Sequence, residues 1–474
     1  MLYNKADRVR EKGGKMASQA DTVIIGGGVG GTALGALLAS AGQRVILVEK
    51  NRIIGGRCAS YTRDGFVVDV GVHLFGLGEK GPLGEVCRRA GEPEAISWVL
   101  ARHPRVSVHF RGQTQAFTRE MMSANVKKNE LGNLARIMLQ VMQMKEEELS
   151  RLWHTPLREW LAGFTADPSV HGLFAMLCGI YFCITPEVAS AAEFIRTLRE
   201  VMAARSSAYP RGGCGAIPRA FQRILEKHGG EARLGCPAEK ILIEQGRARG
   251  VMAGGEVIEA GRVVSNADIK ATIGGLAGAE HFPSDYVQRI QGLTWTAHVV
   301  ALKVALDTKV TDQKMIMYLP DLSEEEMAKL QRQYLEGGSL PMVAGGMLNS
   351  PTNFDPDLAP PGRQLIFFGT RCERHQDWGK WGEIMMDALC QVFPGIEKHV
   401  LWTALDSPDT VERYAGEEGN VIGVGQTVDQ IHERRPHHQT PVKDLFLCSA
   451  EAGGHGIGTE LAASSALELA EKLL

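Results

Sequence analysis

The sequence predicts an α/β fold in which parallel strands and a β-hairpin form one domain and an inserted α+β part forms a second. Three observations lead to this prediction. Short apolar runs that end in glycine-rich turns stand near both ends of the chain, and a hairpin pattern lies between them. The chain of 474 residues is also too long for one simple domain.

The first apolar run and its turn open the first domain. Val23–Ile25 has the all-apolar character of a buried parallel strand. Gly26 allows a tight turn, Gly28 lets the backbone approach a pyrophosphate, and Gly31 lets the next helix pack on the strand. Glu49 ends the second predicted strand, where a carboxylate can accept hydrogen bonds from ribose hydroxyls. This unit therefore predicts a dinucleotide site at a helix N-terminus.

A second glycine element follows the acid. Gly55 and Gly56 precede Arg57, whose planar guanidinium can donate two parallel hydrogen bonds to a phosphate. A plain NAD site does not require this element. The alternative is that Arg57 is a solvated loop charge.

Two further pieces continue the pattern. Residues 442–448 form an apolar run that leads to Glu451 and a glycine-rich turn, after which Gly458 and Thr459 are expected to open a helix rich in Ala and Ser. A glycine turn, a helix and a β-hairpin pattern occupy residues 209–268.

Taken in order, these motifs resemble the FAD-dependent oxidoreductases of the amine oxidase and phytoene desaturase superfamily, in the branch that includes carotenoid isomerases and retinol saturases. The resemblance implies FAD held non-covalently by segments from both ends of the chain. It places Glu49 at the adenosine ribose, Arg57 near the phosphates and Ala238 at the adenine. Glu451 stands where an aspartate usually contacts the ribityl chain, and the helix that opens at Gly458 would face the flavin ring. The predicted cofactor-binding residues are Gly26, Gly28, Gly30, Gly31, Glu49, Lys50, Gly55, Gly56, Arg57, Ala238, Glu451, Gly458 and Thr459.

The positions of these pieces give the expected domain limits. The first 20 residues are polar and basic and lack the apolar core of a signal peptide, and Met16 is a possible true start because it stands just before the first predicted strand. The expected parts are a disordered tail (1–20), a Rossmann-like FAD-binding domain (20–85, 205–290 and 425–474) and a substrate domain (86–205 and 291–424).

Composition narrows the function classes. A net charge of −3 suggests no nucleic acid partner, and nine cysteines without a CxxC pair favour neither a disulfide framework nor a metal site, which fits a cytoplasmic protein. No apolar run approaches the length of a membrane span. The helical pattern of residues 131–161 and the apolar segment 173–184 favour core packing. Two alternatives are the wall of an apolar substrate tunnel and peripheral contact with a membrane.

The leading prediction is a flavin enzyme that desaturates, saturates or isomerises an unsaturated, isoprenoid-like substrate. Its electron partner would be a quinone, oxygen or NAD(P), and the sequence does not define its oligomeric state. His73 and His455 are the candidate catalytic residues, as polar groups expected to border the flavin ring. The alternatives are a flavin amine oxidase and a non-enzymatic flavoprotein that carries isoprenoids; the turn after Glu451 contains no Tyr or Trp, which disfavours the amine oxidase.

Overall fold

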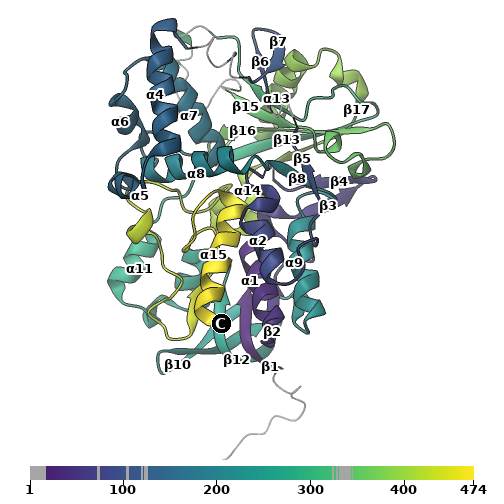
Figure 1. Ribbon diagram of the computed structural model, residues 1–474. Helices are drawn as coiled ribbons and strands as arrows, with labels where there is room; N and C mark the ends of the chain where they lie inside the picture. Colours follow the sequence, from purple (N-terminus) through teal and green to yellow (C-terminus); the bar gives the residue numbers. More distant parts are fainter. Residues whose placement is uncertain are drawn as a thin grey trace, which may run out of the picture.

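Two seven-stranded sheets and the helices packed on them make up the computed structural model (Figure 1). The first sheet lies at one end of the molecule, and the second sheet and helices α4–α8 lie at the other. The structure describes residues 18–71, 75–102, 106–118, 121, 126–322, 325–326, 329, 332, 343 and 345–474.

The first sheet is parallel at its centre and antiparallel at one edge. Its strand order is β10-β11-β12-β1-β2-β9, and β18 also pairs with β12. Strands β12, β1, β2, β9 and β18 run parallel, whereas β10–β11 and β11–β12 are antiparallel neighbours. The strands are β1 (Ser18–Ile25), β2 (Val45–Glu49), β9 (Glu231–Leu234), β10 (Ala238–Glu244), β11 (Arg247–Ala253), β12 (Glu256–Ser265) and β18 (Leu445–Leu447). The predicted parallel strands and hairpin are therefore confirmed.

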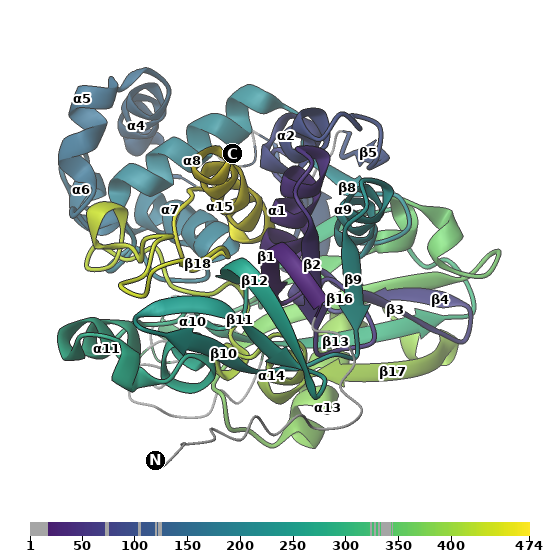
Figure 2. The same cartoon turned by 90° about the horizontal axis from the view of Figure 1, so that it is seen from below.

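Helices cover both faces of this sheet. Figure 2 shows α1, α9 and α15 on one side of β1, β2 and β12, and α10 and α11 on the other. Buried apolar side chains form a separate core on each face. Because α1 is enclosed by the sheet and its neighbouring helices, nearly all its residues are buried, and a Cβ on Gly35 would lie 3.5 Å from Cδ1 of Ile24. The helices are α1 (Val29–Ser40), α2 (Pro82–Arg89), α9 (Ala216–Lys227), α10 (Ile269–Ala271), α11 (Ser284–Gln291) and α15 (Gly458–Leu473).

The second sheet is mostly antiparallel and has the order β17-β13-β16-β15-β14-β6-β7. One of its faces packs on α13 (Trp378–Val392). The opposite face contacts the hairpin of β3 (Ser60–Arg63) and β4 (Phe66–Asp69). The strands are β6 (Ser107–Phe110), β7 (Gln113–Ala116), β13 (His298–Leu306), β14 (Met315–Tyr318), β15 (Gly346–Asn349), β16 (Gln364–Cys372) and β17 (Val400–Asp406). Strand β5 (Trp98–Leu100) pairs with β8 (Ala208–Pro210), and α14 (Pro408–Ala415) contacts β13 and β17.

The helical segment predicted for the first insertion is present. It consists of α4 (Leu131–Gln143), α5 (Glu146–Leu149), α6 (Leu157–Ala162), α7 (Pro168–Phe182) and α8 (Ala191–Ala204). These helices share one apolar core. None of the helices in the described ranges is both long enough and apolar enough to cross a bilayer.

The predicted boundary of the tail is wrong by three residues. The tail was expected to extend to residue 20, but β1 begins at Ser18, and Ser18 pairs with Ile258. The long partner strand β12 extends β1 towards its N-terminus, which periodicity in residues 18–25 could not reveal. Met16 lies outside the described residues.

Candidate functional site

The predicted cofactor residues gather at the carboxyl ends of the parallel strands. β1, β2, β12 and β18 end at Ile25, Glu49, Ser265 and Leu447. In open parallel sheets, ligands bind in the crevice outside these strand ends. Segments separated by most of the chain therefore meet at a single ligand position.

The first glycine turn is packed too tightly to accept side chains. Gly26 has φ +96°, a conformation that favours glycine, and a Cβ on Gly31 would lie 2.2 Å from the Gly26 carbonyl oxygen. A Cβ on Gly28 would lie 2.7 Å from Nδ2 of Asn266, and one on Gly30 would lie 2.6 Å from its Oδ1. The Asn266 amide thus packs against the turn, and the start of α1 presents only backbone there.

Glu49 is held beside this turn. It is 5% exposed, and its Oε2 accepts a hydrogen bond from the N–H of Gly27 at 2.7 Å. Its Oε1 accepts from the backbone N–H of Asn51 at 2.8 Å. The N–H of Cys236 donates to the Glu49 carbonyl oxygen at 2.8 Å, which brings the start of β10, at Ala238, to the same strand end. The predicted adenine residue Ala238 thus follows a direct contact with Glu49 by two residues.

The second glycine element packs on the first. The N–H of Gly55 donates to the carbonyl oxygen of Gly27 at 2.8 Å, and Gly56 approaches Gly28. Next in the chain, Arg57 donates from Nε to the carbonyl oxygen of Asn420 at 3.0 Å. Burial lowers the pKa of Arg57 to about 10, an effect opposed by nearby carboxylates, so the guanidinium stays charged at neutral pH. The alternative of a solvated loop charge is wrong. Lys50, by contrast, is exposed.

The C-terminal piece closes on the N-terminal turn. A Cβ on Gly30 would lie 3.0 Å from the carbonyl oxygen of Cys448, directly after β18. Glu451 is 1% exposed and accepts a hydrogen bond from the N–H of Ile269 at 2.8 Å. Burial and the carboxylate of Asp268 raise the pKa of Glu451 to about 8, against the effect of Arg57. Because glutamate is one methylene longer than aspartate, Glu451 reaches the start of α10.

The helix that opens at Gly458 begins as predicted. No side chain caps its N-terminus, and a Cβ on Gly458 would meet no atom of the described residues within 4 Å. Thr459 follows in the first turn and is half-buried. Helix N-termini attract negative charge, since their first N–H groups lack intrahelical partners. Helix α1, with Gly28 as its N-cap, likewise has no capping side chain among the residues that the structure describes.

The residues present fit FAD. Two uncapped helix N-termini and the cation of Arg57 suit phosphate and an electron-rich ring, and Glu49 suits ribose hydroxyls. The bare backbone of the glycine turn lets a pyrophosphate approach closely. The individual residue assignments stay predictions.

A buried network that the sequence did not suggest fixes the central glycine loop. Asp69 is 1% exposed and accepts hydrogen bonds from the Ser60 hydroxyl at 2.6 Å, the Cys214 N–H at 2.9 Å and the Tyr209 hydroxyl. The N–H of Gly215 donates to the Ser60 oxygen at 2.7 Å. The only sign in the sequence is an acid that ends the apolar run of β4.

The two candidate histidines have different outcomes. His73 lies outside the described residues. His455 is half-buried in the turn before α15, and its backbone N–H donates to the Ser464 hydroxyl at 3.4 Å. The carboxylates of Glu193 and Glu468 lie close enough to interact electrostatically with it. Its proposed catalytic role stays a prediction.

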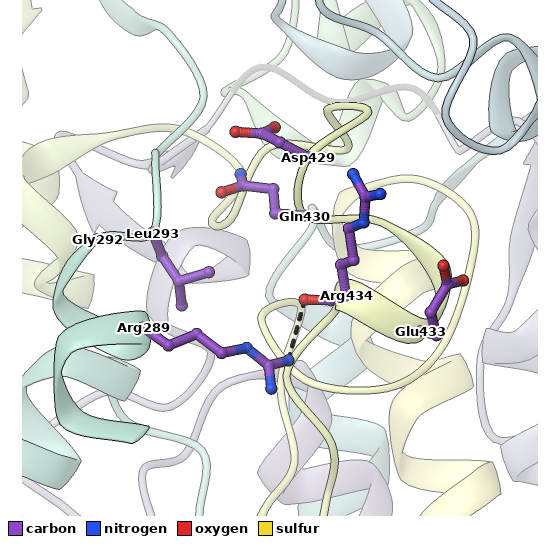
Figure 3. Close-up of a pocket in the computed structure, with 7 residues that line it drawn as sticks. All are labelled: Arg289, Gly292, Leu293, Asp429, Gln430, Glu433 and Arg434. Atoms are coloured by element: carbon purple, nitrogen blue, oxygen red, sulfur yellow. Dashed lines mark hydrogen bonds between the residues drawn. The ribbon is translucent and has the colours of Figure 1, made fainter. Parts of the chain in front are cut away.

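A pocket of about 400 Å³ lies apart from these residues (Figure 3). Charged and polar side chains of the segment 429–434 face α11 across it, and Arg289 donates to the carbonyl oxygen of Arg434 at 3.0 Å. It contains none of the predicted cofactor residues, and its polar walls do not suit an apolar substrate. The lining residues are Arg289, Gly292, Leu293, Asp429, Gln430, Glu433 and Arg434.

Comparison with known proteins decides the family. A model of the flavin containing amine oxidoreductases matches residues 30–474. The chain belongs to this family. It is therefore an FAD-dependent oxidoreductase, and the predicted cofactor and enzyme class are confirmed.

Individual proteins that are similar to this oxidoreductase support the same family. A zeta-carotene-forming phytoene desaturase of Myxococcus xanthus is 26% identical, over 93% of this chain and 91% of its own. A chloroplastic prolycopene isomerase of Daucus carota is 24% identical, over 85% and 71%. The crystal structure of an oxidoreductase from Methanosarcina mazei, at 20% identity, covers 95% of this chain and 99% of its own with a TM-score of 0.74, which shows that the fold is shared. The α/β fold class and the resemblance to this superfamily are confirmed.

Proposed function

We propose that this oxidoreductase acts on an unsaturated, apolar substrate of the isoprenoid type by desaturation, saturation or flavin-assisted isomerisation. The observation that carries the proposal is the match to both a phytoene desaturase and a prolycopene isomerase over most of the chain. Both proteins are named for polyene hydrocarbons, and the two names describe different reactions. The shared feature is therefore the class of substrate.

Helix α7 supports an apolar substrate. Its sequence is apolar on nearly every side, but full burial is confined to residues four positions apart. Between them, Leu173 and Met176 are only partly buried, and Ile180 is 37% exposed. Apolar side chains that are left partly uncovered suit contact with a hydrocarbon, to which methionine adapts well. The buried stripe consists of Val170, Phe174, Cys178 and Phe182.

The protein's part in the reaction is to bind and orient FAD and the substrate and to place charged groups beside them. FAD, when bound, supplies hydride acceptance or donation. We assign the phosphates to the first turn of α1 and Arg57, the ribose to Glu49 and the ribityl chain to Glu451. The uncapped N-terminus of α15 would stabilise negative charge that develops on the ring. His455, in the adjacent turn, is the proposed proton carrier.

The remaining assignments extend this proposal. The helical segment and the second sheet would form the inserted substrate domain, with the rest of the chain forming the FAD-binding domain. Electrons would pass to a quinone, oxygen or NAD(P). The amphipathic helix α4, where Leu139 is 52% exposed and Met142 is 41% exposed, would contact the membrane in which such a substrate dissolves. Flotation with neutral liposomes should then carry the protein, and its absence from the lipid fraction would refute the contact.

The substrate experiment uses the holoenzyme and two polyenes dispersed in liposomes. Phytoene incubated under each candidate acceptor should lose hydrogen in pairs and form longer conjugated products, which chromatography with absorbance detection resolves. A prolycopene sample with reduced flavin tests for geometric change without net oxidation. Reaction with neither polyene, together with hydrogen peroxide release from amines, would replace this proposal with an amine oxidase.

A further inference from the structure

The peptide of Gly456, in the turn before α15, is held on both sides by buried side chains from outside that turn. Its N–H donates to Oε1 of Glu193, on α8, at 2.8 Å. Its carbonyl oxygen accepts a hydrogen bond from Nε2 of Gln426. Glu193 is 2% exposed and Gln426 is 4% exposed, so neither contact is exchanged for water at low cost.

The two arms of this clamp are also joined to each other. The N–H of Ser190 donates to the backbone oxygen of Gln426 at 3.1 Å, and its hydroxyl caps α8 by accepting from the N–H of Glu193 at 3.4 Å. The clamp therefore connects the start of α8 with the turn that leads into α15. Any shift of the helical segment would move the Gly456 peptide.

One atom of the clamp lacks a hydrogen-bond partner among the described residues. This atom is Oε1 of Gln426, which is buried. Its orientation follows from chemistry, because the carbonyl oxygen of Gly456 can only accept and so requires the amide nitrogen to face it. A buried acceptor without a donor costs free energy, and such an atom indicates a ligand group that supplies the donor.

Open space lies next to Gly456, whose carbonyl oxygen the Gln426 amide contacts. Gly456 has φ +102° and is itself buried, yet a Cβ built on it would meet no atom of the described residues within 4 Å. The same holds for Gly458, two residues later. Of the two ligands proposed for this enzyme, a hydrocarbon has no hydrogen-bond donor, whereas FAD has a ring N–H and ribityl hydroxyls.

We infer that Gln426 is a further cofactor-contacting residue, which accepts a hydrogen bond from bound FAD, and that Glu193 is the positioning residue that fixes Gly456 from the opposite side. This inference rests on the FAD site proposed above and on no assumption about the substrate. It makes the helical segment part of the cofactor site, through α8.

The test compares variants of the full-length protein reconstituted with FAD labelled with ¹⁵N in the ring. Gln426→Met keeps the length of the side chain but removes both the free acceptor and the amide donor to Gly456, so FAD should bind at least about tenfold more weakly. The NMR signal of the ring N–H, or the infrared band of the ribityl hydroxyls, should also shift. The exposed Gln140→Met on α4 is the control for the substitution itself.

Glu193 is tested by a pair of variants. Glu193→Ala removes the acceptor for Gly456 and should weaken FAD binding by about tenfold, whereas Glu193→Gln should restore it to within about twofold, because an amide oxygen accepts the same N–H. The matched control is Glu159→Gln on α6, an exposed carboxylate in the same helical segment.

The inference is overturned if Gln426→Met retains both wild-type affinity and unshifted cofactor signals, which would mean that water satisfies Oε1. A Glu193→Gln variant as weak as Glu193→Ala would overturn the positioning role. None of these measurements uses turnover. A failure to convert polyenes would therefore refute the proposed substrate without affecting the test of Gln426 and Glu193.

Discussion

Several glycines of the first glycine turn cannot be replaced, because a Cβ would overlap neighbouring atoms. Gly31 is the sharpest case, since a Cβ there would lie 2.2 Å from the carbonyl oxygen of Gly26. The clash involves backbone on both sides, so no side chain can move to relieve it. With alanine at position 31, β1 and α1 could not keep their present arrangement.

We therefore expect Gly31→Ala to abolish FAD binding. The flavin absorbance of the purified protein at saturating FAD would fall to background, and the melting temperature would drop as well. Gly132→Ala, in the exposed part of α4 with no atom within 4 Å, should be as stable as the wild type or slightly more stable, by about 0.5–1 kcal/mol. Normal flavin content in Gly31→Ala would show that the turn does not hold the cofactor.

Glu460 gives the fold a specific pH dependence. It is buried in the first turn of α15 and accepts hydrogen bonds from the N–H groups of Leu77 at 2.8 Å and Gly78 at 3.1 Å. Burial raises the pKa of Glu460 from its ordinary 4.5 to about 7, although these hydrogen bonds oppose the shift. The folded protein then binds more protons than the unfolded chain, so this contribution to stability is complete below pH 4.5 and is lost as the pH rises to 7.

Glu460→Gln should remove that dependence. The amide oxygen can accept one or both N–H groups and carries no charge, so the variant should melt a few degrees above the wild type at pH 8 and show little advantage at pH 5. Thermal melts of the holoenzyme at both pH values measure this, with Glu159→Gln as the surface control. An equal difference at the two pH values would contradict the assignment of the effect to this carboxyl.

At the scale of elements, Asp69 joins the hairpin of β3 and β4 to the central glycine loop. Asp69→Ala should lower the free energy of unfolding by about 3–5 kcal/mol, since it leaves buried donors from Ser60, Tyr209 and Cys214 without an acceptor. Asp69→Asn should cost less, because the Tyr209 hydroxyl can accept from the new amide. Urea unfolding curves compare the two variants, and equal losses would contradict this account.

Local patterns predicted some of these elements well and failed for others. The strand–glycine–helix units could be predicted because each depends on residues close in sequence: Gly26 and Gly31 at one end, Gly458 at the other. The roles of Glu193 and Gln426 could not be predicted, because both side chains contact Gly456, which lies in a third segment distant in sequence from Glu193. In sequence, Glu193 resembles an ordinary acid in the first turn of a helix.

At the scale of the whole molecule, a buried ion pair lies where the β3–β4 hairpin meets the second sheet. Lys303 on β13 is 0% exposed, pairs with Asp406 on β17 and lies 5.3 Å below the ring of Tyr61. The Lys303 ammonium cannot reach water when Asp406 is removed. This pair is therefore a sensitive probe of that contact.

We expect Asp406→Ala to destabilise the protein by about 3–5 kcal/mol, because it leaves a buried ammonium unpaired. The double variant Lys303→Met with Asp406→Leu should recover most of that loss, since it replaces the pair with apolar groups. Urea unfolding of both variants provides the comparison. Breaking the exposed pair of Arg89 and Glu471 with Arg89→Ala should cost at most about 1 kcal/mol. A double variant no better than the single one would show that the charges themselves are needed.

Strand β18 pairs with β12 in the first sheet, and it follows every other strand of the described residues in the sequence. On a ribosome, the glycine turn at the beginning of the chain would emerge long before the strand and helix that complete its surroundings. The coenzyme could then be captured only after β18 and α15 have also emerged. A cell short of flavin would therefore accumulate chains that have been synthesised past α15 but carry no coenzyme.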